Sequence, residues 1–99
     1  MYATIIRCDL RALASSAERG RTGRSLAAAL GGLPGFVAFV ALEAEGEAGA
    51  VAALCIVEDR ASLVAAQRRT AAWHTEACGA AGGGVEELGA GAVIAQRGL

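Results

Sequence analysis

The sequence predicts an α+β domain with the element order β-α-β-β-α-β, in which an antiparallel sheet carries two helices on one face. Four short segments are rich in strand-forming residues, and the two segments that follow the first and third of them carry helix-capping residues. This order is one of the common ways to cover a sheet with two helices. The chain has 99 residues, which is enough for one such domain.

The first half of the chain contains the first strand, the first helix and the second strand. Residues 2–8, "YATIIRC", are rich in strand-forming side chains. Ser15 and Glu18 form a capping-box pattern that starts a helix near Ser16, and a Gly-Gly pair followed by proline ends it. Residues 35–44, "GFVAFVALEA", are expected to form the second strand.

The second half supplies the remaining two strands and the second helix. Residues 49–58, "GAVAALCIVE", are expected to pair with the preceding strand across a turn that carries carboxylates. Asp59 is placed to cap a helix over residues 60–78. The last strand is expected at residues 90–97, "AGAVIAQR", with residues 85–88 leading into it. This order is that of the ferredoxin-like fold.

Both middle strands are apolar on both faces. Alternate residues of a strand point to opposite sides, so the second strand is expected to project Phe36, Ala38, Val40 and Leu42 on one face, and Val37, Phe39 and Ala41 on the other. Two helices cover only one face of a sheet, so the other face needs an apolar partner. A second copy related by a two-fold axis supplies one, and we expect a homodimer through the open sheet face.

Composition argues against several classes of partner. The net charge is −1 and the sequence pI is about 5.8, whereas nucleic-acid-binding domains are usually strongly basic. The longest apolar run, residues 30–42, is interrupted by proline and glycine and is too short to cross a bilayer. Cys8, Cys55 and Cys78 are widely spaced in a chain without a recognisable signal peptide. We therefore expect a cytoplasmic protein with reduced thiols, and neither a nucleic acid nor a membrane as partner.

The second helix carries a lane of polar side chains. At about 100° per residue, Gln67, Thr70 and His74 are expected to stack near the centre of the face toward the sheet, with Trp73 at its edge. Buried polar groups need hydrogen bonds, so these groups either bond the backbone, water and one another, or line a pocket where His74 exchanges protons near neutral pH. A metal at His74 and Cys78 is disfavoured, because two ligands are too few.

The chain resembles the dimeric α/β-barrel superfamily, and most closely the antibiotic-biosynthesis-monooxygenase-like proteins. The resemblance is carried by "MYATIIR", "LPGFVAFVALEA", "VAALCIVEDRASL", a tryptophan late in the second helix and "GAGAVIAQRG", in order and over nearly the whole chain. It implies two sheets paired back to back and a small ligand held between sheet and helices. The haem-degrading branch is less similar, because it uses an asparagine on the first strand and this chain has no asparagine.

Our hypothesis is a cofactor-independent monooxygenase-like protein that acts on a small hydroxy-aromatic or polyketide-type substrate. His74 would take a proton, Gln67 and Thr70 would orient substrate oxygens, and Trp73, by the resemblance, would flank the ring or else only seal the helix edge. Arg7 would meet a substrate oxyanion or, as we favour, pair with an acidic neighbour. No flavin, nicotinamide or metal signature is recognisable, so no cofactor is expected. The alternative is a non-catalytic small-ligand-binding or dimerisation module of the same fold.

Overall fold

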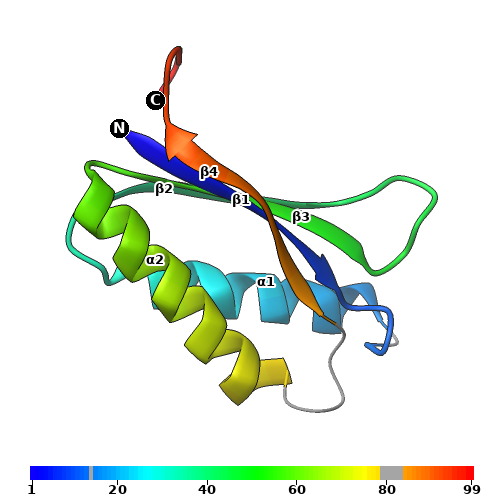
Figure 1. Ribbon diagram of the computed structural model, residues 1–99. Helices are drawn as coiled ribbons and strands as arrows, with labels where there is room; N and C mark the ends of the chain where they lie inside the picture. Colours follow the sequence, from blue (N-terminus) through cyan, green and yellow to red (C-terminus); the bar gives the residue numbers. More distant parts are fainter. Residues whose placement is uncertain (14, 79–83) are drawn as a thin grey trace.

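The computed structural model describes residues 1–13, 15–78 and 84–99, and it contains a four-stranded antiparallel sheet with both helices on one face (Figure 1). This arrangement confirms the predicted α+β class and the ferredoxin-like order. The elements are β1 (Tyr2–Asp9), α1 (Ser16–Gly31), β2 (Phe36–Glu43), β3 (Ala50–Val57), α2 (Arg60–Trp73), a π-helical turn η1 (His74–Cys78) and β4 (Val85–Ala92).

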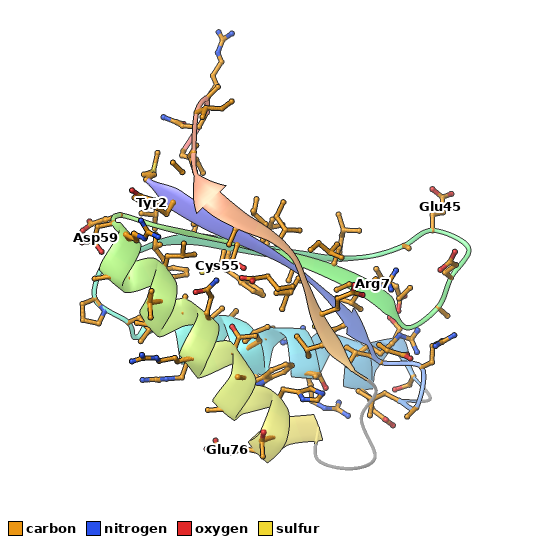
Figure 2. All side chains as sticks on the ribbon, in the orientation of Figure 1. Tyr2, Arg7, Glu45, Cys55, Asp59 and Glu76 are labelled. Atoms are coloured by element: carbon orange, nitrogen blue, oxygen red, sulfur yellow. The ribbon has the colours of Figure 1, made fainter. Side chains whose placement is uncertain are left out.

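The sheet has the strand order β2-β3-β1-β4, so β1 and β3 lie in the middle and β2 and β4 at the edges. The core fills the space between the sheet and the helices, and Figure 2 shows Cys55 of β3 pointing into it. Alternate residues of the central strands, together with one side of each helix, form this core. Its buried members are Ile6, Cys8, Leu10, Leu26, Leu30, Ala53, Cys55, Val57, Leu63, Ala66 and Trp73.

Both helices begin at the residues that the capping patterns predict. The Ser15 hydroxyl accepts the backbone N–H of Glu18 at 3.1 Å. The Asp59 carboxylate accepts the backbone N–H of Ser62 at 2.8 Å, and Figure 2 shows Asp59 at the start of α2. Each cap satisfies a backbone donor that the helix itself leaves without a partner.

The second strand contains a bulge that the sequence pattern did not predict. Phe36 pairs with Val57, but Ala38 pairs with Ile56, so Val37 is an extra residue in β2. The bulge reverses the alternation at this point, and Phe36 packs against the core instead of sharing a face with Ala38. The expected grouping of Phe36 with Ala38, Val40 and Leu42 is therefore wrong for Phe36 alone.

The last strand also differs from the prediction, because it covers Val85–Ala92 and not residues 90–97. A strand needs a neighbour to pair with, and β1 pairs with β4 only from Cys8 opposite Val85 to Tyr2 opposite Ala92. Beyond these pairs, the backbone N–H of Val93 donates to the carbonyl of Met1 at 2.9 Å, and that of Asp9 to the carbonyl of Gly84 at 3.1 Å. The apolar residues that follow have no strand opposite them within the described part of this chain, whatever their strand propensity.

The sheet face turned away from the helices exposes large apolar side chains. Ile5 is 44% exposed, Val40 55% and Leu42 59%, and the pairing register places all three opposite the core-facing set. The prediction of a second apolar face is thus confirmed, while the homodimer that would cover it stays a prediction. Among the described helices, none is long and apolar enough to span a membrane.

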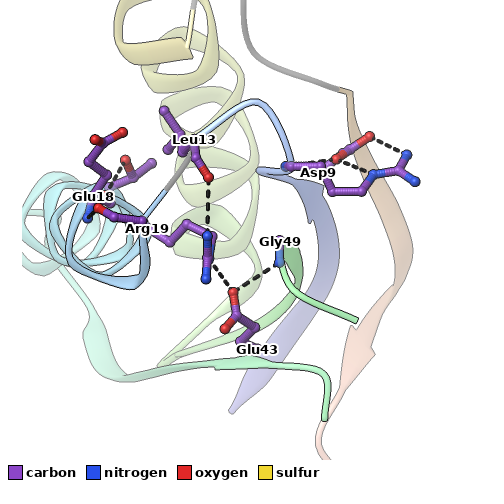
Figure 3. Close-up of polar contacts among 9 residues, drawn as sticks. Asp9, Leu13, Glu18, Arg19, Glu43 and Gly49 are labelled. Atoms are coloured by element: carbon purple, nitrogen blue, oxygen red, sulfur yellow. Dashed lines mark hydrogen bonds and ion pairs between the residues drawn. The ribbon is translucent and has the colours of Figure 1, made fainter. Parts of the chain in front are cut away.

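A polar cluster joins α1 to the hairpin between β2 and β3 (Figure 3). The Arg19 guanidinium donates to the Glu43 carboxylate and, at 3.1 Å, to the carbonyl of Leu13. The backbone N–H of Gly49 donates to the same carboxylate at 2.9 Å. These donors hold the pKa of Glu43 below its ordinary value, with the Gly49 bond the largest cause and the Arg19 bond the next.

Candidate functional site

A cavity of about 390 Å³ lies between α2 and the β1–β4 side of the sheet. We call it the α2–β4 cavity. It combines apolar side chains with hydroxyl, amide, imidazole and carboxylate groups, which is the usual make-up of a small-molecule site. The residues that line it are Thr4, Ile6, Gln67, Thr70, Ala71, His74, Thr75, Val85 and Glu87.

The structure brings together the three polar residues that the helical spacing places in one lane. Gln67, Thr70 and His74 all line the α2–β4 cavity. Thr70 is buried, and its hydroxyl donates to the carbonyl of Ala66 at 2.9 Å. This bond satisfies the donor, and the hydroxyl oxygen keeps lone pairs that can accept from a ligand.

His74 is half-buried and is the first residue of the π-helical turn η1. The predicted helix over residues 60–78 is therefore α-helical only as far as Trp73. The backbone N–H of His74 donates to the carbonyls of both Thr70 and Ala71, where the helix changes from α to π geometry. Such π turns are rare and occur often at functional sites, because they displace a side chain from the regular helical stripe.

Glu87 belongs to the cavity although sequence reasoning did not single it out. A second bulge, between Ile5 and Ile6, places Glu87 opposite Ile6 and leaves Leu88 as the extra residue of β4. Glu87 therefore faces the helices, whereas its neighbour Glu86 faces the open side. The sequence does carry a signal for this residue, because two adjacent carboxylates in a strand point to opposite faces and one of Glu86 and Glu87 must therefore face the helices.

The Glu87 carboxylate connects three elements around the cavity. Its Oε1 accepts the side-chain amide N–H of Gln67 at 2.6 Å and the hydroxyl of Thr4 at 2.9 Å. Gln67 belongs to α2 and Thr4 to β1, so one carboxylate oxygen joins the helix to two strands. Hydrogen bonds to an ionised acceptor are stronger than neutral ones, which fixes the amide and hydroxyl in place.

Trp73 does not line the α2–β4 cavity. It is 6% exposed and belongs to the core, and its indole N–H donates to the hydroxyl of Ser25 on α1 at 3.1 Å. The expectation that His74 is central and Trp73 peripheral is therefore wrong. The buried residues of α2 are Ser62, Leu63, Ala66, Thr70 and Trp73, because this helix packs against α1 as well as the sheet.

Arg7 lies on the opposite side of the sheet from the cavity. It pairs with Ala52 and Glu86 in the sheet, and its guanidinium donates to the Glu86 carboxylate at 3.1 Å, so the salt-bridge interpretation is confirmed. Both side chains are more than half exposed, so the pair adds little to stability. Arg7 also borders a hollow of about 480 Å³ near the hairpin, with Asp9, whose pKa the Arg11 guanidinium holds at about 2.

Another cavity, of about 420 Å³, lies between α1 and β2. We call it the α1–β2 cavity. Gly20, Gly23 and Ala27 supply small side chains on the helix, and Phe39 supplies an aromatic ring from the sheet. Its polar groups include the Arg19–Glu43 pair, which is already joined to the hairpin. It contains no histidine, so the α2–β4 cavity is the better candidate for proton transfer.

The described residues contain no cluster of three or more side chains suited to a metal ion. Cys8 and Cys55 are buried and are not joined in a disulfide. Burial raises the pKa of the Cys55 thiol, which keeps it protonated and unreactive near neutral pH. The alternative of a metal at His74 and Cys78 involves the side chain of Cys78, which lies outside the described residues.

Comparisons with known proteins identify the fold. The chain matches no protein-family model and no curated protein sequence. An asparagine-to-alanine variant of SnoaB, a cofactor-independent oxygenase from Streptomyces nogalater, matches with a TM-score of 0.73 and 17% identity over 96% of this chain and 94% of that chain. An arginine-to-serine variant of MhuD, with two manganese protoporphyrin IX bound per active site, matches with a TM-score of 0.69 and 22% identity over 99% of both chains.

A candidate antibiotic biosynthesis monooxygenase from Chloroflexus aurantiacus matches with a TM-score of 0.63 and 16% identity, over 98% of this chain and 96% of that chain. The TM-scores establish a shared fold, but identities this low do not establish a shared function, which must be argued from the site itself. The predicted resemblance to antibiotic-biosynthesis-monooxygenase-like proteins is confirmed at the level of the fold.

Proposed function

We propose that this chain is a cofactor-independent oxygenase that acts on a small hydroxy-aromatic or polyketide-type substrate in the α2–β4 cavity. The observation that carries the proposal is the position of His74, which lines a cavity large enough for a small aromatic molecule. Histidine exchanges protons near neutral pH, and here it begins a π-helical turn. The fold that this chain shares with SnoaB, a cofactor-independent oxygenase, also supports the proposed activity.

The chemistry needs a base and molecular oxygen. His74 takes a proton from an activated CH₂ group of the substrate and leaves a resonance-stabilised carbanion. The carbanion transfers electrons to O₂ and bonds to it, and the returned proton converts the adduct to a hydroperoxide. Loss of water then gives a ketone, so that R₂CH₂ and O₂ become R₂C=O and H₂O. The substrate supplies all four electrons, so no redox cofactor is required.

The surrounding residues suit a substrate that is mostly apolar. Ile6 and Val85 provide apolar wall, while the Thr70 hydroxyl can accept a hydrogen bond from a substrate hydroxyl. Gln67 uses its amide N–H on Glu87 and keeps its carbonyl oxygen as an acceptor. We assign no substrate contact to Trp73 or Arg7, because neither lines this cavity.

The assembly that we propose is a cytoplasmic homodimer in which the open sheet faces meet. The apolar side chains of Ile5, Val40 and Leu42 on this face support it, since exposed patches of this kind mark interfaces. The alternative function is a non-catalytic module that binds a small ligand or serves dimerisation. The presence of a cavity lined by several polar groups favours ligand binding over dimerisation alone.

The test is oxygen consumption with hydroxy-aromatic substrates, including 1,8-dihydroxyanthrone, each corrected for the uncatalysed reaction. We expect turnover by the wild type, with one atom of ¹⁸O₂ in the ketone and the other in water. His74→Ala should lower kcat by about 100-fold or more, which is the usual contribution of a general base.

Glu76→Gln is the matched control, because Glu76 is polar, exposed, on the same turn and does not line the cavity. It should retain the wild-type rate. Equal inertness of the wild type and His74→Ala on every substrate would reject the enzyme in favour of the non-catalytic module.

A further inference from the structure

The described lining of the α2–β4 cavity contains a carboxylate and no arginine or lysine, whereas a site for aromatic acids or oxyanions would need a positive charge. Among its described lining residues, Glu87 is negatively charged, His74 is ionisable, and none is an arginine or lysine. Arg7, which follows the lining residue Ile6 in β1, is bonded to Glu86 on the opposite face of the sheet. Strand alternation therefore places the two adjacent carboxylates on opposite faces of the sheet, with Glu86 in the salt bridge and Glu87 at the cavity.

The hydrogen bonds of Glu87 leave part of its acceptor capacity unused. An ionised carboxylate offers about four lone-pair positions. Two donors, Gln67 and Thr4, both bond to Oε1, at 2.6 and 2.9 Å. Because these donors come from α2 and β1, the carboxylate is held in position before any ligand arrives, which lowers the cost of ordering it on binding.

We propose that Glu87 makes the α2–β4 cavity selective for ligands that donate a hydrogen bond, such as phenols, and selective against ligands that carry a negative charge. A phenolic hydroxyl can donate to the remaining lone pairs of the carboxylate. A carboxylate or sulfonate ligand would instead bring a second negative charge beside the first, whereas the carbanion of the proposed reaction forms beside the His74 that has just taken up its proton. This inference rests on the proposed function in using the same cavity, and it narrows the substrate class from hydroxy-aromatic compounds in general to those without an acidic group.

The experiment compares 1-naphthol with 1-naphthalenesulfonate at neutral pH by ¹H–¹⁵N chemical-shift titration. For the wild type we expect the Kd of 1-naphthol to be about tenfold lower than that of 1-naphthalenesulfonate. One charge-assisted hydrogen bond at a partly exposed site provides a difference of this size. Glu87→Gln keeps the shape and removes the charge, so it should bring the two Kd values to within about twofold. Glu86→Gln, next in the chain but on the open face, should keep the wild-type ratio.

Equal Kd values for the two probes in the wild type would overturn the inference, as would the same ratio in Glu87→Gln as in Glu86→Gln. If Glu87→Gln does not fold, Glu87→Thr, which keeps strand propensity, is measured by the same titration.

The outcome is separable from that of the oxygen assay. Selective binding of 1-naphthol without oxygen consumption supports the inference and rejects the proposed activity. Oxygen consumption by the wild type, with no effect of Glu87→Gln on ligand selectivity, supports the proposed activity and rejects the inference.

Discussion

Replacement of Trp73 by phenylalanine tests whether the indole holds the core or serves the ligand. Trp73 is 6% exposed and donates its N–H to Ser25 on α1. Phenylalanine keeps one ring but loses this hydrogen bond, which contributes about 0.5–1.5 kcal/mol. It also leaves unfilled part of the volume of the larger ring, at a cost of about 1 kcal/mol. We therefore expect Trp73→Phe to lower the free energy of unfolding by about 2 kcal/mol.

Such a loss is large for a domain of this size, because it corresponds to a decrease in Tm of about 10 °C. Urea unfolding followed by far-UV circular dichroism measures it, since the variant lacks the sole tryptophan. The protein concentration must be equal for all variants, because the stability of a dimer depends on it.

The hydrogen bond itself is isolated by a double-mutant cycle with Ser25→Ala. We expect a coupling energy of about 0.5–1 kcal/mol between the two positions. This is less than for a hydrogen bond between two buried groups, because Ser25 is exposed. Binding of 1-naphthol should change by less than about twofold in Trp73→Phe, because the indole does not line the cavity. A loss of stability below about 0.5 kcal/mol together with a lost ligand affinity would refute the structural role.

Three further predictions concern the fold and its assembly. Asp59→Ala removes the cap of α2 and should lower the free energy of unfolding by about 1 kcal/mol in urea titrations. Glu43 has a lowered pKa in the folded state, so its contribution is present above its ordinary pKa of 4.5 and is lost as pH falls through the folded value. Glu43→Gln should therefore flatten the loss of Tm below about pH 4.5, whereas Glu45→Gln at the hairpin tip should not. Leu42→Glu on the open sheet face should weaken dimerisation in sedimentation equilibrium. Val64→Glu, which is also exposed but lies on α2, should leave dimerisation unchanged. A stable, soluble wild-type monomer at micromolar concentration would contradict the dimer.

Local chemistry made much of this fold predictable from the sequence. The two caps are a clear case, because Ser15 and Asp59 each satisfy a backbone donor three residues away and need no distant partner. The lane formed by Gln67, Thr70 and His74 is another, because helical spacing alone brings these residues to one side. The element order followed from these signals together with the apolar strands.

The errors arose where pairing between distant segments decides the outcome. A bulge reverses the faces of a strand, and nothing near Phe36 or Glu87 in the sequence indicates that Val37 or Leu88 is an extra residue in its strand. The limits of β4 depend on the length of β1, which is why the predicted strand was displaced toward the C-terminus. Trp73 was misplaced for a similar reason, because the packing of α2 against α1 turns the buried face of α2.

Chemical-shift mapping of ¹⁵N-labelled wild type with 1-naphthol shows most directly where the chain binds a small aromatic ligand. If the α2–β4 cavity is the site, saturable shifts will be centred on the backbone amides of Gln67, Thr70 and His74. Saturable shifts centred instead on Gly23 and Phe39 of the α1–β2 cavity, or no saturable shifts at all, would contradict it.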